Sequence, residues 1–573
     1  MRYHIISIAA LLLSTMALQA QTLDIEHLAG GNTLVRVSEP QNTRYLLLPI
    51  EEKASEAPVK IICGNDLSRT ISVRLALDKV DYMVPLDLSE WAGEDIKFLI
   101  HLPVDRATGR DAQNEICWSK MKLSEVIDTE NREIFRPAYH HTPEYGWMND
   151  PNGMFYKDGE WHLYYQWGPY GSMWNNLTWG HSVSRDLIHW EYRPEAIKPD
   201  ALGYIFSGSC VVDHNNTAGF GKDAVIALYT SAAEVQSQSL AYSLDGGDTF
   251  IKYPGNPILT ADIADFRDPN MFWNEEIGKW NLILACGQEM RIYTSDNLID
   301  WKEESRFGQS YGSHDGVWEC PDLFKLPVEG TSEEKWVLFC NINPGGPSGG
   351  SATQYFIGDF DGHKFTCESK PEVTKWMDYG KDHYATVTFD NAPEGRRVAI
   401  AWMSNWQYAN QVPTQQYRSG NSIPRDLGLF EYKGETYCSV VPSPEMTAAR
   451  SKKAGKKLTE SCEMVVNLKG NATITLSNDK GEKVVMNYDA KAETFSMDRT
   501  KSGKMDFSKD FAAVTKAPTY GNISQLRIFI DKSSIEALDA DGKMSMTNLV
   551  FPSKPYNKVT VKGKGKYQVY DIK

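Results

Sequence analysis

A loose repeat of short turn segments constrains the fold of this chain more than any other feature of its sequence. Residues 184–190 (SRDLIHW) recur as 243–250 (SLDGGDTF) and 295–301 (SDNLIDW), and more weakly as 359–365 (DFDGHKF). The aromatic ends of the copies lie about 50 to 65 residues apart, and short aromatic-rich strands precede each copy. Units of this length with four strands each are typical of a β-propeller. A large irregular β-sandwich is the alternative that the spacing alone leaves open.

The repeat predicts five blades and, together with its flanks, an all-β fold class. Four copies are visible, and a fifth unit fits residues 384–389, 397–403 and the stretch up to Leu429. Short strand candidates precede the repeats, and a lysine-rich linker leads to a last strand-rich segment. We therefore predict a five-bladed β-propeller followed by a C-terminal β-sandwich, with an extra N-terminal β-sandwich-like domain. The predicted boundaries are 1–20 for a signal peptide, 21–132 for the N-terminal β-rich accessory domain, 133–447 for the propeller and 455–573 for the C-terminal sandwich.

The composition excludes several classes of function. A formal net charge of -15 over 573 residues argues against a nucleic-acid partner, whose phosphates attract basic surfaces. The 16 Trp and 28 Tyr residues suit a sugar ligand, because aromatic rings stack on the C–H faces of sugars. The histidines show no HExxH or other metal-ligand spacing, so we predict no catalytic metal and no cofactor. The nine cysteines include no CxxC pair, so we expect mostly buried thiols with room for one disulfide.

The first twenty residues have the pattern of a secretory signal peptide. Arg2 supplies a positive charge, residues 5–13 form an apolar core too short to span a bilayer, and residues 17–20 (ALQA) offer a cleavage site before Gln21. No cysteine follows within the next forty residues, which argues against a lipid anchor. No later run is long and apolar enough for a transmembrane helix. We expect an exported protein without a membrane span, either periplasmic or secreted.

Three carboxylates precede strands of the repeat units in similar settings. Asp150 and Asp268 are each followed by proline, and Glu319 stands two residues before Pro321. An isolated Asn-Asp-Pro would read as a capped turn, but the innermost strand of each propeller blade lines the axis, so acids at equivalent blade positions converge on one funnel. Carboxylates crowded in a water-poor funnel repel each other, so that one stays protonated while another ionises. Cleavage of a glycosidic bond needs this division of roles.

Two residues beside these acids have more than one interpretation. Cys320 follows Glu319 and is either a small buried group or a group that tunes the acid. Arg267 precedes Asp268 and is either an ion-pair partner or a hydrogen-bond donor to sugar hydroxyls.

A set of motifs along residues 135–573 gives the chain a specific family resemblance. The matching segments are 147–153 (WMNDPNG), 165–166 (YQ), 179–181 (WGH), 206–208 (FSG), 266–269 (FRDP), 319–322 (ECPD), 401–406 (AWMSNW) and 531–536 (DKSSIE). By these residues the chain resembles glycoside hydrolase family 32, the β-fructosidases that include invertases, inulinases and levanases. The family fold is a five-bladed propeller followed by a β-sandwich, which agrees with the repeat count. Residues 21–132 lie outside the family core, and the resemblance assigns them no role.

The resemblance implies catalytic roles for the three acids. Asp150 corresponds to the nucleophile that attacks the anomeric carbon of a fructosyl unit. Glu319 corresponds to the general acid, which protonates the leaving oxygen and then activates water. Asp268 corresponds to the transition-state stabiliser that holds sugar hydroxyls. The reaction is a retaining one, which predicts nucleophile and acid carboxyl groups about 5–5.5 Å apart.

The resemblance also implies a set of substrate-binding residues. Those that match the −1 pocket are Asn149, Gln166, Trp174, Phe206, Ser207, Arg267 and Trp402. Residues 378–385 (DYGKDHYA) add a contact at Asp382 or Tyr384, although His383 stands where the family more usually has an aromatic residue. Trp406 is a candidate either for the rim of the funnel or for packing between blades.

These roles lead to one leading hypothesis and two alternatives. The leading hypothesis is an exported, retaining and exo-acting glycoside hydrolase that releases fructose from levan, inulin, fructo-oligosaccharides or sucrose. The alternatives are an endo-acting levanase or inulinase and a non-catalytic fructan-binding protein. The presence of all three acids argues against the non-catalytic binder. No motif distinguishes levan from inulin, and none indicates the oligomeric state.

Overall fold

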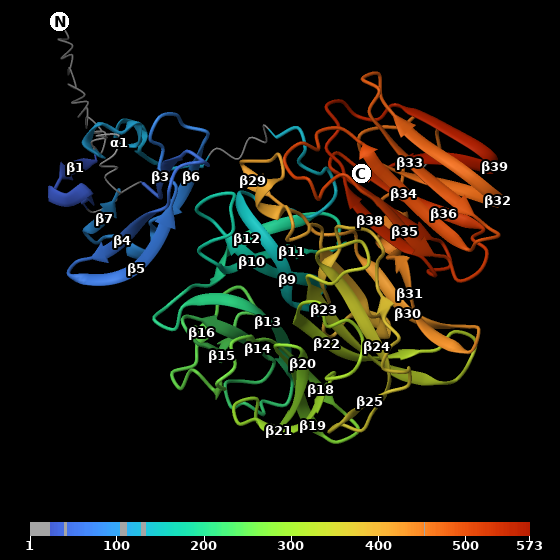
Figure 1. Ribbon diagram of the computed structural model, residues 1–573. Coiled ribbons are helices and arrows are strands. Elements are labelled where there is room, and N and C mark those ends of the chain that lie inside the picture. The colour runs from blue at the N-terminus through green and yellow to red at the C-terminus, as the bar shows by residue number, and fades with distance from the viewer. Residues whose placement is uncertain (1–22, 39–42, 103–111, 128–132, 452) are drawn as a thin grey trace, which may run out of the picture. The chain divides into compact units, whose positions relative to one another are not determined.

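A computed structural model describes residues 23–38, 43–102, 112–127, 133–451 and 453–573, which form almost entirely β-structure (Figure 1). The chain divides into two compact units, residues 1–127 and 128–573. The predicted signal peptide, residues 1–20, lies outside the described residues. Within the described part of the chain, no helix has the length and apolar character needed to cross a membrane.

The N-terminal unit is built from two antiparallel sheets. Their strand orders are β1–β2–β7–β4–β5 and β6–β3–β8. Buried and more exposed residues alternate along β2 and β7, so Val35, Val37, Phe98 and Ile100 point to the interior. The predicted N-terminal β domain is thereby confirmed. Its elements are β1 (Asp24–His27), β2 (Asn32–Val37), β3 (Tyr45–Ile50), β4 (Ala57–Cys63), β5 (Asp66–Val73), β6 (Tyr82–Asp87), β7 (Ile96–His101), α1 (Ile116–Lys120) and β8 (Lys122–Ser124).

Five sheets follow, each built on four antiparallel strands, which confirms the five-bladed propeller and excludes the irregular sandwich. Blades 1 and 2 contain β9 (Gly146–Lys157), β10 (Glu160–Gly168), β11 (Thr178–Ser184), β12 (Trp190–Ile197), β13 (Tyr204–Asp213), β14 (Ala224–Ala232), β15 (Gln236–Ser243) and β16 (Ile251–Lys252). Blades 3 and 4 contain β18 (Phe266–Asn274), β19 (Lys279–Cys286), β20 (Glu289–Ser295), β21 (Lys302–Phe307), β22 (Val317–Pro327), β23 (Glu334–Asn343), β24 (Ala352–Phe360) and β25 (Phe365–Cys367). Blade 5 contains β27 (Tyr384–Thr388), β28 (Val398–Trp402), β30 (Arg425–Tyr432) and β31 (Glu435–Pro442). Short strands β17 (Leu259–Thr260) and β26 (Lys375–Trp376) pair with the third strands of blades 2 and 4.

The repeated sequence segment is the turn between the third and fourth strand of a blade. In blade 1, Asp186 Oδ1 accepts hydrogen bonds from the backbone N–H groups of Ile188 and His189 at 3.0 and 2.8 Å. Asn297 in blade 3 and Asp361 in blade 4 cap the corresponding turns in the same way. Because a short Asx side chain stabilises such a turn, Asp or Asn recurs at this place in the repeat.

The ring of blades is closed at the strands that carry the first motif. Strand β29 (Tyr417–Arg418) pairs in parallel with the start of β9. The innermost strands contact one another in sequence, and β27 of blade 5 contacts β9 of blade 1. Trp147, Leu163, Tyr384 and Trp402 belong to one hydrophobic cluster between these two blades. Residues from the two ends of the propeller are thereby brought side by side.

The C-terminal domain is a β-sandwich organised on one long strand. Strand β32 (Cys462–Ser477) shifts register between Leu468 and Ala472, so its first half pairs with β36 and its second half with β33. Both halves bury side chains in one core that includes Met464, Ile474 and Leu526. The predicted sandwich is confirmed. Its remaining elements, with the helix before it, are α2 (Pro444–Ala448), β33 (Lys483–Asp489), β34 (Thr494–Lys501), β35 (Val514–Pro518), β36 (Gln525–Asp531), β37 (Ser534–Asp539), β38 (Ser545–Leu549) and β39 (Lys558–Asp571).

Buried polar contacts join the propeller to this sandwich. The two ring nitrogens of His140 lie 2.8 Å from Asp531 Oδ2 and 2.7 Å from Glu536 Oε1. Arg425 of β30 forms ion pairs with Glu536 and with Asp378, and all three side chains are buried. The motif at residues 531–536 therefore supplies two of the acids of the domain interface, Asp531 and Glu536.

All nine cysteines lie among the described residues as free thiols. Seven are buried, while Cys63 and Cys367 are partly exposed. The disulfide for which the sequence left room is therefore not formed.

Candidate active site

A cavity of about 380 Å³ opens at the inner strands of the propeller. The three acids singled out in the sequence line it from three blades: Asp150 on β9, Asp268 on β18 and Glu319 on β22. The structure thus brings the three carboxylates together, while their catalytic roles stay predictions. The full lining is Asn149, Asp150, Gln166, Trp174, Leu177, Phe206, Ser207, Gln236, Asp265, Arg267, Asp268, Glu319 and Trp406.

Each innermost strand carries a β-bulge beside the cavity, and β9 has a second bulge further along, at Gly153–Met154. In all five blades two residues of the innermost strand oppose one residue of the second strand. Three of the bulge residues have positive φ: Asp268 at 65°, Cys320 at 42° and Ala385 at 52°. Because a bulge breaks the alternation of a strand, it re-aims side chains toward the cavity. The bulged pairs are Asn149–Asp150, Phe206–Ser207, Asp268–Pro269, Cys320–Pro321 and Ala385–Thr386.

The three acids do not stand at equivalent blade positions, which corrects the expectation from the sequence. Glu319 is the last paired residue before its bulge, Asp268 is the first bulged residue and Asp150 is the second. Consecutive side chains of a regular strand would point to opposite faces, but the bulges allow three successive positions to reach one cavity. A proline beside each acid therefore indicates that a bulge is near. It does not indicate that the three acids occupy the same position in their blades.

Asp150 is held by hydrogen bonds on both carboxylate oxygens. Asn149 Nδ2 donates to Oδ1 at 3.0 Å, and the Ser207 hydroxyl donates to Oδ2 at 2.8 Å. The Cys320 sulfur lies 3.5 Å from Oδ2. Burial and then the charge of Glu319 raise the pKa of Asp150, while the hydrogen bonds from Asn149 and Ser207 act in the opposite direction. The carboxylate is fixed by one neighbour in its own strand and another in the next blade.

Asp268 is the most enclosed of the three acids, with 4% of its surface exposed. Its Oδ2 accepts a hydrogen bond from the backbone N–H of Cys320 at 2.9 Å. Burial raises the pKa of Asp268 to about 7, although the adjacent Arg267 acts against this shift, and the charges of Glu319 and Asp150 add to it. A carboxyl group in this site therefore binds a proton close to neutral pH.

Glu319 also accepts hydrogen bonds on both oxygens. Arg267 Nε and Nη2 lie 3.0 and 2.9 Å from Oε1, and the Tyr384 hydroxyl donates to Oε2. The remaining nitrogen of the guanidinium, Nη1, contacts Asp265 Oδ1 at 2.6 Å and Gln236 Oε1 at 3.2 Å. Among the residues that line the cavity, Arg267 is the one cation, and it shares the cavity with four carboxylates.

Six of the nine predicted substrate-binding residues line the cavity. Its aromatic surfaces come from Trp174, Phe206 and Trp406. The rings of Trp174 and Phe206 meet edge to face, with 6.3 Å between their centroids. Their contacts with a sugar stay predictions. The six are Asn149, Gln166, Trp174, Phe206, Ser207 and Arg267.

Two further predicted residues lie directly behind the cavity wall. Tyr384 reaches the site through the hydroxyl that donates to Glu319. Trp402 is fully buried in β28, and its ring packs against that of Trp406 with 4.8 Å between centroids. Of these two tryptophans, Trp406 lines the cavity, and Trp402 supports it from behind.

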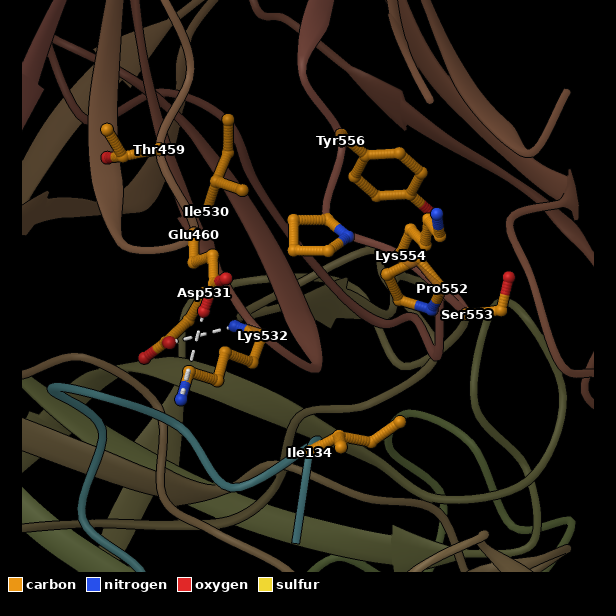
Figure 2. A pocket seen from close by; sticks show the side chains of 11 residues that line it. Ile134, Thr459, Glu460, Ile530, Asp531, Lys532, Pro552, Ser553, Lys554 and Tyr556 are labelled. Atoms are coloured by element: carbon orange, nitrogen blue, oxygen red, sulfur yellow. Dashed lines mark hydrogen bonds and ion pairs between the residues drawn. The ribbon is translucent and has the colours of Figure 1, made fainter. Parts of the chain in front are cut away.

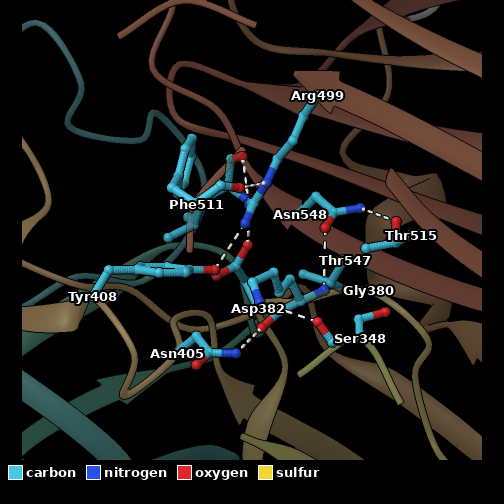
Figure 3. A network of polar contacts seen from close by, with 12 residues as sticks. Ser348, Gly380, Asp382, Asn405, Tyr408, Arg499, Phe511, Thr515, Thr547 and Asn548 are labelled. Carbon is cyan, nitrogen blue, oxygen red and sulfur yellow. Dashed lines mark hydrogen bonds and ion pairs between the residues drawn. The ribbon is translucent and has the colours of Figure 1, made fainter. Parts of the chain in front are cut away.

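Asp382, the last predicted contact, lies in the domain interface and does not line the cavity. Its carboxylate accepts hydrogen bonds from Arg499 Nη1 and the Tyr408 hydroxyl, each at 2.5 Å, and from the Leu549 N–H at 2.8 Å (Figure 3). The chain runs from this interface into β27, so only its later residue Tyr384 approaches the site. The resemblance left the contact open between Asp382 and Tyr384, and of these two only Tyr384 approaches the cavity.

Leu177, Gln236 and Asp265 line the cavity without having been predicted. Asp265 directly precedes β18, two residues before Arg267. Because residues i and i+2 of an extended chain share a face, this spacing was a signal that could have identified it. Gln236 comes from the third strand of its blade, where no motif marks it.

A second cavity, of about 300 Å³, lies on the C-terminal sandwich (Figure 2). Ile530, Tyr556 and neighbouring prolines form much of its wall, and Lys532 approaches Glu460 only to 3.9 Å. Its two acids are Glu460 and Asp531, and Asp531 is held by His140, so the propeller cavity with its four acids is the candidate active site. Within the described ranges, no group of three or more His, Cys, Asp or Glu side chains is arranged to hold a metal ion.

Family models match both domains of the second unit. The glycosyl hydrolases family 32 N-terminal domain matches residues 140–440, and the glycosyl hydrolases family 32 C-terminal model matches residues 439–573. A domain of unknown function (DUF4980) matches residues 29–139. By fold and site the chain is a glycosidase of the propeller class. It belongs to glycosyl hydrolase family 32, as the motifs predicted.

Individual relatives extend this likeness. The levanase of Bacillus subtilis is 44% identical over 455 residues, which cover 74% of this chain and 67% of the levanase. The extracellular exo-inulinase of Aspergillus niger is 38% identical over 483 residues, covering 73% of this chain and 90% of that enzyme. The crystal structure of exo-inulinase from Aspergillus awamori superposes with a TM-score of 0.73 at 34% identity, covering 78% of this chain and 99% of that one.

Proposed function

We propose that the chain hydrolyses β-D-fructofuranosides by a retaining mechanism in the propeller cavity. The observation that carries the proposal is the convergence of Asp150, Asp268 and Glu319 on one cavity that holds a single cation. A retaining glycosidase needs one ionised and one protonated carboxyl group beside the scissile bond. Relatives named levanase and exo-inulinase support a β-fructofuranosyl linkage as the substrate.

In the first step, Asp150 attacks the anomeric carbon of a terminal fructosyl unit while Glu319 gives its proton to the leaving oxygen. The hydrogen bonds from Asn149 and Ser207 fix the direction of the attacking carboxylate before substrate arrives. In the second step, Glu319 takes a proton from a water molecule. This water displaces Asp150, so fructose leaves with its anomeric configuration retained.

Asp268 has the role of holding fructosyl hydroxyl groups in this mechanism. Burial raises the pKa of Asp268 to about 7, because the carboxylate is removed from water. Hydrogen bonds from fructosyl hydroxyl groups would replace those from water and stabilise the charged form of Asp268. This stabilisation increases as positive charge develops on the sugar ring in the transition state.

The size of the cavity favours exo action. About 380 Å³ is near the lower end of the range for small-molecule sites, roughly 300–1,000 Å³, and suits a terminal unit better than a long internal segment. Endo action is the alternative, and the products separate the two: fructose alone indicates exo cleavage, whereas a ladder of oligosaccharides indicates endo cleavage. A non-catalytic fructan-binding protein would give neither.

Export and domain boundaries are part of the proposal. Residues 1–20 act as a signal peptide that directs the protein to the periplasm or the medium, and relatives named extracellular support this. The proposed domains are 21–132, 133–447 and 455–573, and the extents of the three family models support divisions near these limits. N-terminal sequencing of the exported protein tests the leader, with a first residue of Gln21 expected.

Product profiling on levan, inulin and sucrose side by side tests the function. The wild type is expected to release fructose from at least one of them, without a ladder at early times. Asp150→Asn, checked for an unchanged melting temperature, is the matched control and should release none. A wild type that binds fructan but releases no fructose from any substrate would defeat the proposal.

A further inference from the structure

Arg267 lies between two carboxylates of the cavity wall that differ in exposure. Its Nη1 contacts Asp265 at 2.6 Å, while Nε and Nη2 contact Glu319 at 3.0 and 2.9 Å. The side chain of Asp265 is 37% exposed, against 12% for Arg267. The Asp265 carbonyl accepts a hydrogen bond from the Gly287 N–H at 2.9 Å, which ties the residue to the turn after β19. Asp265 thus binds Nη1 of Arg267, while Nε and Nη2 of the same guanidinium face Glu319, the proposed general acid.

We propose that Asp265 is a positioning residue for the reaction, which aims Arg267 at Glu319 and offsets part of the Arg267 charge, so that Glu319 keeps its proton to higher pH. A cation in contact with a carboxyl group favours the ionised form, and a second carboxylate on the same cation weakens that effect. The general acid must enter the reaction protonated. This inference rests on the proposed role of Glu319 as that acid.

The other groups near Glu319 either take part in the proposed reaction or are neutral, so they cannot offset the charge of Arg267 in this way. Asp150 and Asp268 are themselves in the proposed catalytic machinery. Tyr384 donates a hydrogen bond to Glu319 and is buried. Burial raises the pKa of the Cys320 thiol well above its ordinary value, so the thiol is neutral. Asp265 is the carboxylate of the cavity that touches Arg267 from the solvent side.

Asp265→Asn tests the proposal because it keeps an acceptor of the same size for Nη1 and removes the charge. The readout is the pH dependence of kcat/KM on whichever of sucrose, levan or inulin the wild type cleaves fastest, and the basic limb of this profile reports loss of the proton from the general acid. We expect the basic limb to move to lower pH by roughly 0.5–1 unit, a modest shift because the group is partly exposed. The melting temperature stays close to that of the wild type, since Asp265 belongs to no buried core.

Gln236→Glu is the reciprocal variant. Gln236 Oε1 lies 3.2 Å from the same Nη1, so a carboxylate there adds the kind of charge that Asp265→Asn removes. The basic limb of the kcat/KM profile of Gln236→Glu should therefore move to higher pH. The double variant restores the number of charges around Arg267, and its basic limb should return to the wild-type position.

Two results would overturn the inference. One is a fall in kcat/KM by the same factor at every pH in Asp265→Asn with the basic limb unmoved, which would indicate a merely structural contact. The other is movement of the limb in the same direction in both single variants. Failure of the proposed function looks different: the wild type would release no fructose, or Asp150→Asn would keep full activity.

Discussion

The propeller cavity and the interface between propeller and sandwich both enclose several carboxylates, with opposite consequences. In the cavity, four acids share one cation, Arg267, and burial raises the pKa of Asp268 to about 7. At the interface, burial acts in the same direction on Asp378 and Glu536, but the positive charge of Arg425 and their hydrogen bonds outweigh it and lower the pKa of both acids.

This difference shows that the protonation state of a buried acid in this molecule depends on the cations near it as well as on its burial. At the interface, Arg425 and His140 nearly match in number the acids that they contact, so these acids stay ionised and hold the domains together. In the cavity four acids share one cation, and this excess of negative charge favours binding of a proton, as acid–base chemistry requires. The sharpest tests of this comparison alter one charge in one region and measure both activity and stability.

The largest effect is expected for Asp150→Asn in the cavity. Loss of the nucleophile should lower kcat by roughly 10⁴-fold or more. Stability should not fall, because the change removes a negative charge from a crowded group of acids. Initial rates on sucrose and a thermal melt of the same preparation measure the two quantities. A variant as active as the wild type would remove Asp150 from the mechanism.

Glu319→Ala should lower activity in a way that depends on the leaving group. Loss of a general acid costs about 10²- to 10⁴-fold on sucrose or fructan, whose leaving oxygen needs the proton. A fructoside with an activated leaving group needs little protonation, so its first step should lose far less. Comparison of kcat/KM on the two substrates checks this, and equal losses on both would argue against an acid role for Glu319.

At the interface, Arg499→Met should affect stability more than catalysis. The variant leaves Asp382 buried without its cation, which costs about 3–5 kcal/mol of unfolding free energy. Denaturant titration measures the loss, and the folded fraction should keep wild-type kcat on sucrose. A second variant, Arg499→Met with Asp382→Leu, should recover part of the loss because no unpaired charge remains. A single variant of unchanged stability would contradict the proposed role of the interface charges.

The smallest effect is a pH dependence of stability from two adjacent histidines. Burial opposes the charge of His140, yet hydrogen bonds to Asp531 and Glu536 raise its pKa to about 9. Since an unfolded histidine titrates near pH 6.5, this stabilisation is fully present below about pH 6.5 and is lost as the pH rises through 9. The unfolding free energy should therefore fall by on the order of 1–3 kcal/mol across that window.

His141 is the matched control for this titration. Burial lowers the pKa of His141 to about 4, so its contribution is lost on the acid side, as the pH falls from about 6.5 toward 4. His140→Gln should flatten the alkaline fall in urea unfolding free energy, whereas His141→Gln should leave that fall in place. An alkaline fall that persists in His140→Gln would assign it to another group.

Much of the fold could be predicted because one local feature occurs once in each of the first four blades. Asp186 in blade 1 and Asn297 in blade 3 each stabilise the turn between the third and fourth strand, so the spacing between successive turns of this kind reports the length of a blade. The convergence of acids followed from the same geometry, since every inner strand faces one axis. A turn of this kind depends only on residues that are neighbours in the chain, so the sequence alone can predict it.

The rest depends on contacts between segments that lie far apart in the chain. Asp150 is the second residue of its bulge, Asp268 is the first, and Glu319 directly precedes its bulge; the neighbouring prolines do not report these offsets. Asp382 pairs with Arg499, more than a hundred residues away, which no local motif could indicate. Gln236 enters the cavity only because its blade packs beside blade 3. Local signals thus predicted the strands and turns, while tertiary pairing decided which side chains reach the site.

The central claim is that Asp150 is the nucleophile among the acids of the cavity. The most direct measurement uses the Glu319→Ala variant with an activated fructofuranosyl donor, because loss of the base slows hydrolysis of the covalent intermediate. Intact-mass spectrometry and peptide mapping should find one fructosyl unit attached to Asp150. Rapid turnover without an adduct, or an adduct on any other residue, would contradict this account.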